Sequence, residues 1–297
     1  MTSKNSTPRS KVSIVVPTLN QGEFIEETIL SISKQTYTSI EIIIVDGGST
    51  DQTLEILNRY KRVITYISEP DTGISEALNK GFDLAKGEII GWLNSDDVYY
   101  GKGTIEHIVQ CFDAFKDVDI VYGDAVIISR DSTLLKYRLL LPYQSARMIR
   151  ANRICQPATF MRKRVIDQVR PADYLTLDYE YWLRLDALGF AYQHTPKILA
   201  ADRQHQTRIS KLRREEMNQE MRIYRKAYLS DRNKNVQRIL LIIDRLLQFL
   251  LRIKGVYLSF LIWLDIEAFG PLAFPLKVDS LKLLIYRELF RSATGVE

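Results

Sequence analysis

Short apolar runs alternate with amphipathic stretches over the first hundred residues of the chain. Runs rich in Val and Ile, with few charges, are typical of strands that are buried on both faces of a sheet. They occur at residues 12–19, 40–45, 63–68 and 89–94. Between them, apolar residues recur three and four positions apart, which predicts helices that pack one face against the sheet. These patterns occur at residues 22–33, 54–60 and 75–86. The alternation predicts an α/β fold, with a Rossmann-like, mostly parallel sheet flanked by helices.

Polar side chains stand where these apolar runs end. Thr18 and Asn20 follow the first predicted strand, Asp46 follows the second and Asp96 follows the fourth. Ligands of parallel α/β sheets bind beyond the carboxyl ends of the strands, so we expect these side chains to share one site. The chain has no G-x-G-x-x-G and no Walker A sequence. Dinucleotide and P-loop sites therefore lose their main support.

The fourth strand ends in a row of polar residues, Asn94, Ser95, Asp96 and Asp97. Two adjacent carboxylates repel each other, and ionised carboxylates at the rim of a core need a cation or hydrogen-bond donors. A divalent ion such as Mg²⁺ or Mn²⁺ supplies this neutralisation and binds a diphosphate on its other side. The alternative interpretation is that these short polar side chains cap a following helix.

Composition narrows the class of protein without choosing a partner. The chain has 297 residues, 46% of them hydrophobic, which suffices for a sizeable core. Its net charge of +5 is uneven, because basic residues concentrate after position 130. This distribution suits an acidic substrate, an anionic membrane or nucleic acid. Cys111 and Cys155 stand far apart without metal-ligand spacing, so we expect neither a zinc site nor a disulfide framework.

The ends of the chain carry no recognisable targeting segment. Residues 1–11 are mostly polar and are expected to form a mobile tail, and no run reaches the roughly 18 uncharged apolar residues that a membrane span needs. We therefore expect the folded part of the chain to lie in the cytoplasm.

Four segments, taken in order, resemble the family 2 glycosyltransferases and their type A fold. They read VSIVVPTLN at 12–20, EIIIVDGGSTD at 41–51, EPDTGISEALNKG at 69–81 and IIGWLNSDD at 89–97. The resemblance implies an inverting transfer from a nucleoside diphosphate sugar, assisted by a divalent metal, Mn²⁺ or Mg²⁺. The acceptor would be a glycan or a lipid-linked molecule, as in cell-surface polysaccharide synthesis.

The resemblance also implies roles for individual residues. Asp46 would contact the base, Asp71 would help to hold the nucleoside and Asp96 would bind the metal. The chain departs from the family at Asn94, where the family often has an aspartate, and this removes one negative charge from the site. The expected donor-binding residues are Pro17, Thr18, Asn20, Asp46, Asp71, Lys80, Asn94, Ser95 and Gln156. Lys80 either faces phosphates or is a solvated surface charge.

The second half of the chain offers a candidate base. Residues 175–189 have helical periodicity, and Leu177, Tyr181, Leu185 and Leu188 are expected to form one apolar face. Asp178, at the start of that helix, is either an ordinary cap or, by resemblance, the general base that takes the acceptor proton. Glu180 is the competing candidate.

Two further residues have both a chemical and a structural interpretation. Gln156 resembles the family's acceptor-side glutamine near the donor sugar, although the following Pro157 also fits a simple turn. His205 either closes the metal site, as a histidine at this place in the family does, or is structural. Arg203 and Arg208 are nearby in sequence and either neutralise the leaving group or lie on the surface.

The last part of the chain changes character. Residues 213–297 are expected to form a helical region, in which Arg238, Arg245 and Arg252 recur every seven residues among Leu, Ile and Phe. Such a helix must bury its wide apolar side in protein or lipid. Residues 236–276 are therefore expected to contact the inner face of a membrane, with a helical subdomain or a homodimer interface as the alternative.

The patterns together predict a glycosyltransferase domain at 12–212, with a donor-binding half at 12–97 and an acceptor half at 98–212. Asp96 and His205 are the expected metal ligands, and Asp178 is the expected base. One alternative is a sugar-nucleotide-binding protein with weak or no turnover, which Asn94 suggests. A nucleic-acid-binding protein is suggested by charge alone, without any matching motif, so we expect no nucleic-acid partner.

Overall fold

The computed structural model describes residues 10–229 and 277–278, together with Leu246, Phe249 and Ile253. Its strands are β1 (Val12–Thr18), β2 (Ile40–Asp46), β3 (Thr65–Ser68), β4 (Ile89–Trp92), β5 (Val98–Tyr99), β6 (Ile120–Ser129), β7 (Thr133–Arg138), β8 (Thr159–Arg162), β9 (Tyr192–Gln204) and β10 (Lys277–Val278). Its helices are α1 (Ile25–Ser33), α2 (Thr53–Tyr60), α3 (Ile74–Leu84), α4 (Thr104–Ala114), α5 (Ser145–Met148), the 3-10 turn η1 (Gln156–Ala158), α6 (Lys163–Gln168), α7 (Leu177–Ala187), α8 (Ile209–Leu212) and α9 (Arg214–Leu229).

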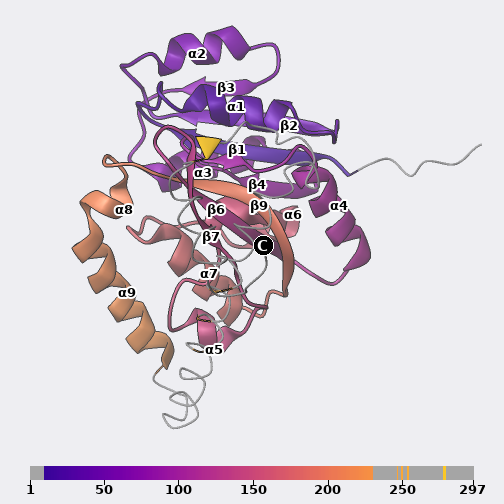
Figure 1. Ribbon diagram of the computed structural model, residues 1–297, viewed down its shortest axis with the longest axis vertical. Coiled ribbons are helices and arrows are strands. Elements are labelled where there is room, and N and C mark those ends of the chain that lie inside the picture. The colour runs from indigo at the N-terminus through magenta and orange to yellow at the C-terminus, as the bar shows by residue number, and fades with distance from the viewer. Residues whose placement is uncertain (1–9, 230–245, 247–248, 250–252, 254–276, 279–297) are drawn as a thin grey trace, which may run out of the picture.

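The first half of the chain forms the parallel part of the sheet. β1 lies between β2 and β4 and is parallel to both, and β3 extends the sheet beyond β2. Every residue of β1 is buried, as its unbroken apolar sequence predicts. In Figure 1 these indigo strands lie together with α1 and α2 at the top of the molecule. The α/β fold that the sequence predicts is confirmed.

The second half of the chain continues the same sheet with mixed pairing. β8 is antiparallel to both β4 and β6, and β9 runs parallel to β6. β6 is one strand from Ile120 to Ser129, and its pairing with β9 shifts register at Gly123 and Asp124. Because β4 pairs with β8, the predicted donor-binding and acceptor halves share one sheet.

The helix α7 differs from its prediction at its carboxyl end. Leu177, Tyr181 and Leu185 are buried as expected, but Leu188 is 61% exposed because the helix ends at Ala187. The expected apolar face is therefore wrong for Leu188. Other faces of α7 are buried as well, since Tyr179, Trp182 and Leu183 also lie in the core. A helix enclosed in this way has no single apolar stripe for periodicity to reveal.

The carboxyl-terminal region is described in part. α9 follows α8 in the chain and runs along the left side of Figure 1. The contact expected of residues 236–276 lies outside the described residues, apart from Leu246, Phe249 and Ile253, which are helical and exposed. None of the described helices combines the length and the apolar character needed to cross a bilayer.

Candidate active site at the carboxyl ends of the strands

Asp46, at the end of β2, shapes the loop that follows it. Its carboxylate is fully buried and accepts hydrogen bonds from the backbone N–H groups of Gly48 and Ser49, at 3.2 and 3.0 Å. The hydroxyl of Ser68, on β3, donates to the same carboxylate at 2.7 Å, and the hydroxyl of Ser49 also donates to it. Gly48 has φ +87°, a conformation that favours glycine. Asp46 therefore fixes the wall of the site between β2 and β3.

Asn20 joins the loop after β1 to the loop after β2. Its backbone N–H donates to the Ser49 hydroxyl at 2.7 Å, and its side-chain oxygen accepts from the Thr50 N–H at 2.8 Å. It adopts a positive φ of 52°, which asparagine tolerates better than most residues. Both loops are thus held at the carboxyl edge of the sheet.

Asp71 lies directly against this pair of loops. A side chain at Gly47 would come within 2.7 Å of the Asp71 Oδ2 atom, so the missing Cβ makes room for the carboxylate. The backbone N–H of Gly73 donates to Asp71 Oδ1 at 3.0 Å. Burial raises the pKa of Asp71, and the neighbouring charges of Glu76 and Asp46 act in the same direction. A positively polarised ligand group beside Asp71 would relieve this cost.

Thr18 presents a polar atom that nothing satisfies. Thr18 follows Pro17 at the end of β1 and is only 5% exposed, and its hydroxyl oxygen has no hydrogen-bond partner among the described residues. A buried hydroxyl without a partner costs free energy, so it marks a position that a ligand would satisfy.

Lys80 is engaged with acidic neighbours. Its Nζ atom lies 2.8 Å from Glu69 Oε1 and 2.7 Å from Glu76 Oε1. A contact between Lys80 and a phosphate would require an exchange of these partners. Of the two interpretations left open by the sequence, this geometry is nearer to a surface ion pair.

Asn94 and Gln156, which are 62 positions apart, lie side by side. Asn94 Nδ2 donates to Gln156 Oε1 at 2.9 Å, and Asn94 Oδ1 accepts from the indole N–H of Trp92 at 2.9 Å. Gln156 Nε2 donates to the backbone carbonyl of Trp92 at 2.5 Å. The 3-10 turn that begins at Gln156 therefore brings the acceptor-side segment against the end of β4.

Asp96 and His205 form the closest pair of candidate metal ligands. Asp96 Oδ2 lies 2.9 Å from His205 Nε2, and the other ring nitrogen of His205 lies 2.8 Å from the Thr207 hydroxyl. The ring of Phe24 packs 4.8 Å from the imidazole ring, centroid to centroid. Ser95 is buried, and its carbonyl accepts a hydrogen bond from the side chain of Thr28 at 2.9 Å. The tip of β4 is thereby fixed against α1.

This pair fits a divalent ion that shares its ligands with a substrate. A carboxylate oxygen and an imidazole nitrogen are both common metal ligands, and an ion bound by both would replace the 2.9 Å hydrogen bond between Asp96 Oδ2 and His205 Nε2. Within the described residues, no group of three or more His, Cys, Asp or Glu side chains is arranged to hold a metal. An ion at Asp96 would therefore complete its coordination with water and diphosphate oxygens, as Mg²⁺ commonly does.

Asp178 lies in the first turn of α7, where both carboxylate oxygens are held. Asn152 Nδ2 donates to Oδ2 at 2.7 Å, and the Tyr179 N–H donates to Oδ1 at 2.8 Å. Burial raises the pKa of Asp178, while these hydrogen bonds and the charge of Arg138 oppose the rise. The competing candidate, Glu180, instead forms a two-bond ion pair with Arg184, at 3.0 Å for each bond.

Charged side chains of alternating sign extend from Asp96 towards Asp178. Arg208 Nε lies 3.9 Å from Asp96 Oδ2, and its Nη1 donates to Asp202 at 2.5 Å. Asp202 lies 3.6 Å from Arg138, whose charge opposes the effect of burial on the Asp178 pKa. Arg208, Asp202 and Arg138 thus form a charged cluster with Asp96, and Asp178 lies within electrostatic reach of its Arg138 end, although 81 residues separate Asp96 from Asp178 in sequence.

The sequence analysis missed three members of this cluster, Asn152, Arg138 and Asp202. Asp202 offered one signal, since it is a carboxylate that directly follows the apolar residues 198–201 of β9. Asn152 and Arg138 lie in or beside a segment without helical or strand periodicity, so no pattern marks them.

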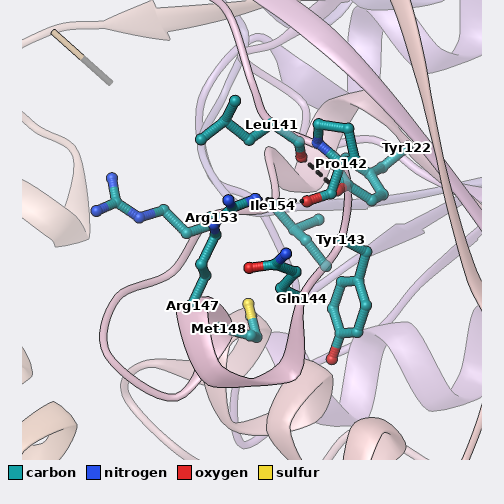
Figure 2. Close-up of a pocket in the computed structure, with 9 residues that line it drawn as sticks. All are labelled: Tyr122, Leu141, Pro142, Tyr143, Gln144, Arg147, Met148, Arg153 and Ile154. Atoms are coloured by element: carbon teal, nitrogen blue, oxygen red, sulfur yellow. Dashed lines mark hydrogen bonds between the residues drawn. The ribbon is translucent and has the colours of Figure 1, made fainter. Parts of the chain in front are cut away.

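Residues of the segment 141–154 line a small pocket together with Tyr122 of β6 (Figure 2). Tyr122 and Tyr143 contribute rings to its wall, and Arg147 and Arg153 contribute guanidinium groups. The hydroxyl of Tyr122 donates to the carbonyl of Leu141 at 2.8 Å, which ties the segment to β6.

The sequence of this chain matches a known protein family. The family model described as glycosyl transferase family 2 matches residues 13–169, more than half of the chain. A PGL/p-HBAD biosynthesis glycosyltransferase of Mycobacterium bovis is 32% identical over 193 residues, which cover 61% of this chain and 73% of that protein.

Solved structures share the fold at low sequence identity. A mannosyltransferase from Pyrobaculum calidifontis, in complex with GDP-Man and Mn²⁺, matches with a TM-score of 0.59 and 19% identity, over 77% of this chain and 66% of that one. TarS from S. aureus, in complex with UDP-GlcNAc, matches with a TM-score of 0.55 and 20% identity, over 67% of this chain and 60% of that one.

Proposed function

This chain belongs to glycosyl transferase family 2, and we propose that it transfers a sugar, with inversion, from a nucleoside diphosphate sugar to a hydroxyl group. The observation that carries the proposal is the charged cluster that extends from Asp96 towards Asp178. An inverting transfer needs a group that stabilises the departing diphosphate and, across the sugar, a base for the acceptor hydroxyl. In this proposal Asp96 serves the diphosphate side and Asp178 the acceptor side, and the charged side chains that extend from Asp96 towards Asp178 support the assignment.

The donor lies, in this proposal, along the carboxyl ends of β1, β2 and β4. Two features support nucleotide binding there. The Thr18 hydroxyl has no hydrogen-bond partner among the described residues, and burial raises the pKa of the Asp71 carboxylate. Asp46 acts on the base side, either directly or through the loop that it holds. The remaining residues assigned to the donor are Pro17, Asn20, Lys80, Asn94, Ser95 and Gln156.

The proposed metal is Mn²⁺ or Mg²⁺, held by Asp96 and His205. The adjacency of a carboxylate and an imidazole at the tip of β4 supports the assignment. When bound, the ion neutralises charge that develops on the diphosphate. Arg208 lies beside Asp96 and adds a second positive charge on the same side.

Asp178 is the proposed base. Its burial raises the pKa, and a carboxylate with a higher pKa takes a proton from a hydroxyl more readily. In this proposal the acceptor approaches Asp178 from the side of residues 141–154, because Asn152 of that segment contacts the carboxylate.

We further propose a glycan or lipid-linked acceptor and peripheral contact with a membrane through residues 236–276. Leu246, Phe249 and Ile253 support the membrane contact, because they are exposed and recur at helical spacing of three and four. The mycobacterial relative is named for PGL/p-HBAD biosynthesis, which supports a biosynthetic role for the proposed transfer.

The test compares the wild-type protein with Asp178→Asn. Both are incubated with Mn²⁺, a panel of labelled nucleoside diphosphate sugars and mixed glycan and lipid acceptors. Asp178→Asn should lose transfer by about a hundredfold or more, since the base is gone, while nucleotide binding, followed by thermal shift, should persist. Asp113→Asn is the matched control, because Asp113 forms an exposed pair with Lys116 away from the site.

Two outcomes would contradict the proposal. Wild-type turnover in Asp178→Asn would remove that residue from the role of base. Nucleotide binding by the wild-type protein without any transfer would instead favour the sugar-nucleotide-binding protein that Asn94 suggests.

A further inference from the structure

The segment between β7 and η1 delivers a side chain to Asp178 from 26 residues away. Asn152 Nδ2 donates a hydrogen bond of 2.7 Å to Asp178 Oδ2. The other carboxylate oxygen, Oδ1, accepts from the N–H of Tyr179 at 2.8 Å. One contact comes from a side chain and the other from the helix backbone, so together they fix the rotation of the carboxylate about its bond to Cβ.

The amide of Asn152 is itself held in place. Its Oδ1 atom accepts a hydrogen bond from the backbone N–H of Ile154 at 3.3 Å. This contact occupies the oxygen and leaves the NH₂ group for Asp178, and the reverse orientation would set an amide oxygen against a carboxylate. The carbonyl of Ile154 in turn accepts from Arg138 Nη2 at 3.2 Å. A continuous series of hydrogen bonds therefore runs from β7 to the candidate base.

We propose that Asn152 is a positioning residue for Asp178, which it holds in the orientation that accepts the proton of the acceptor hydroxyl. This inference rests on the proposed function, in which Asp178 is the base. Asn152 touches no reacting atom itself and acts only through the carboxylate.

The contact also has an electrostatic consequence. A donor that binds a carboxylate favours its charged form, so Asn152 lowers the pKa that burial raises. Among charged side chains, Arg138 of β7 acts on Asp178 most strongly and in the same direction. Glu180, on the same helix, is paired with Arg184. Arg150 and Arg153 lie on either side of Asn152 in sequence.

The test measures the ionisation of Asp178 without any substrate. Full-length protein labelled with carbon-13 at the aspartate carboxyl groups is titrated by NMR, and the Asp178 signal is assigned as the one missing from Asp178→Asn. In Asn152→Ala the Asp178 midpoint should rise by about one pH unit, the effect of losing one hydrogen bond to a charged group. The other aspartates should keep their midpoints.

Asn58→Ala is the matched control. Asn58 accepts an exposed hydrogen bond from the hydroxyl of Tyr66, so its removal should leave the Asp178 midpoint unchanged. If Asn152→Ala fails to fold, Asn152→Leu keeps the side-chain volume and should show the same rise. An Asp178 midpoint equal to that of the wild type in the folded variant would overturn the proposal.

Activity separates this inference from the proposed function. Transfer by Asn152→Ala should fall by roughly tenfold in kcat with an unchanged donor KM, because the donor side is intact. Wild-type turnover in Asp178→Asn would overturn the base assignment, whatever the titration shows. An inactive Asp178→Asn together with an unshifted midpoint in Asn152→Ala would overturn only the role of Asn152.

Discussion

At the scale of single residues, the ionised carboxylate of Asp178 lowers the stability of the folded protein. Its carboxylate is withdrawn from water at the start of α7, and burial raises its pKa. A raised pKa means that the charged form is less favourable in the folded protein than in the unfolded chain. The property that suits a base therefore costs stability, a trade-off that is common at functional sites.

Asp178→Asn should consequently stabilise the protein in a pH-dependent way. Below the pKa of about 3.9 that an aspartate has in an unfolded chain, both states are protonated and the variant should melt near the wild type. As the pH rises from there to the higher folded-state pKa, the wild type loses stability that the uncharged asparagine keeps, so the gap in Tm should grow and level off above that folded-state pKa. Thermal denaturation from about pH 3 to about pH 8 measures this. A gap that shrinks with rising pH would show that the folded state favours the charged carboxylate.

At the scale of elements, close packing of α3 on the sheet depends on Gly81. A Cβ at this position would clash with the side chain of Val15, on β1, and would lie 3.3 Å from Val45 Cγ2, on β2. The absence of a side chain thus lets the helix approach two neighbouring strands at once. The same helix begins directly after the loop that contains Asp71.

Gly81→Ala should destabilise the protein by about 1–3 kcal/mol through overpacking. Alanine favours helices by about 1 kcal/mol over glycine, and the clash must exceed that gain for the prediction to hold. Gly103→Ala, at a position where an added Cβ meets nothing within 4 Å, should change stability by less than about 0.5 kcal/mol. Urea denaturation of both variants gives the comparison. A Gly81→Ala protein as stable as the wild type would mean that α3 can move away from β1.

Elements with a strong period could be predicted from the sequence, and those placed by distant contacts could not. β1, with its continuous apolar run, is confirmed nearly to the residue. The segment around Asn152 has no regular repeat of apolar residues, because its conformation depends on hydrogen bonds with Arg138 and with Asp178 of α7. The pairing of β9 with β6 is similarly a long-range contact that local sequence does not encode.

At the scale of the whole molecule, Arg203 ties the two halves of the chain together. The guanidinium group is fully buried, and its Nε donates to the carbonyl of Asp96 at 2.7 Å. Nη1 donates to the Ser132 hydroxyl at 2.8 Å, and Nη2 to Glu27 of α1 at 2.5 Å. The sequence suggested a leaving-group contact or a surface position for Arg203. Its buried bonds show instead that it holds α1, the tip of β4 and the turn after β6 in register.

Replacing Arg203 therefore tests how much its buried hydrogen bonds contribute to the stability of the protein. Arg203→Met leaves the buried Asp96 carbonyl and Ser132 hydroxyl without their donor, which should cost about 2 kcal/mol or more, at about 1–3 kcal/mol for each unsatisfied buried group. The Glu27 carboxylate also loses its partner, but its side chain is 34% exposed, so that loss adds less. Arg130→Met is the matched control, because Arg130 also pairs with a glutamate, Glu23, but both side chains are largely exposed. Exposed pairs contribute about 0–1 kcal/mol. Guanidinium denaturation separates the two cases. Equal losses in both variants would mean that the buried bonds of Arg203 add nothing beyond a surface contact, and that α1 and β4 are held together by apolar packing alone.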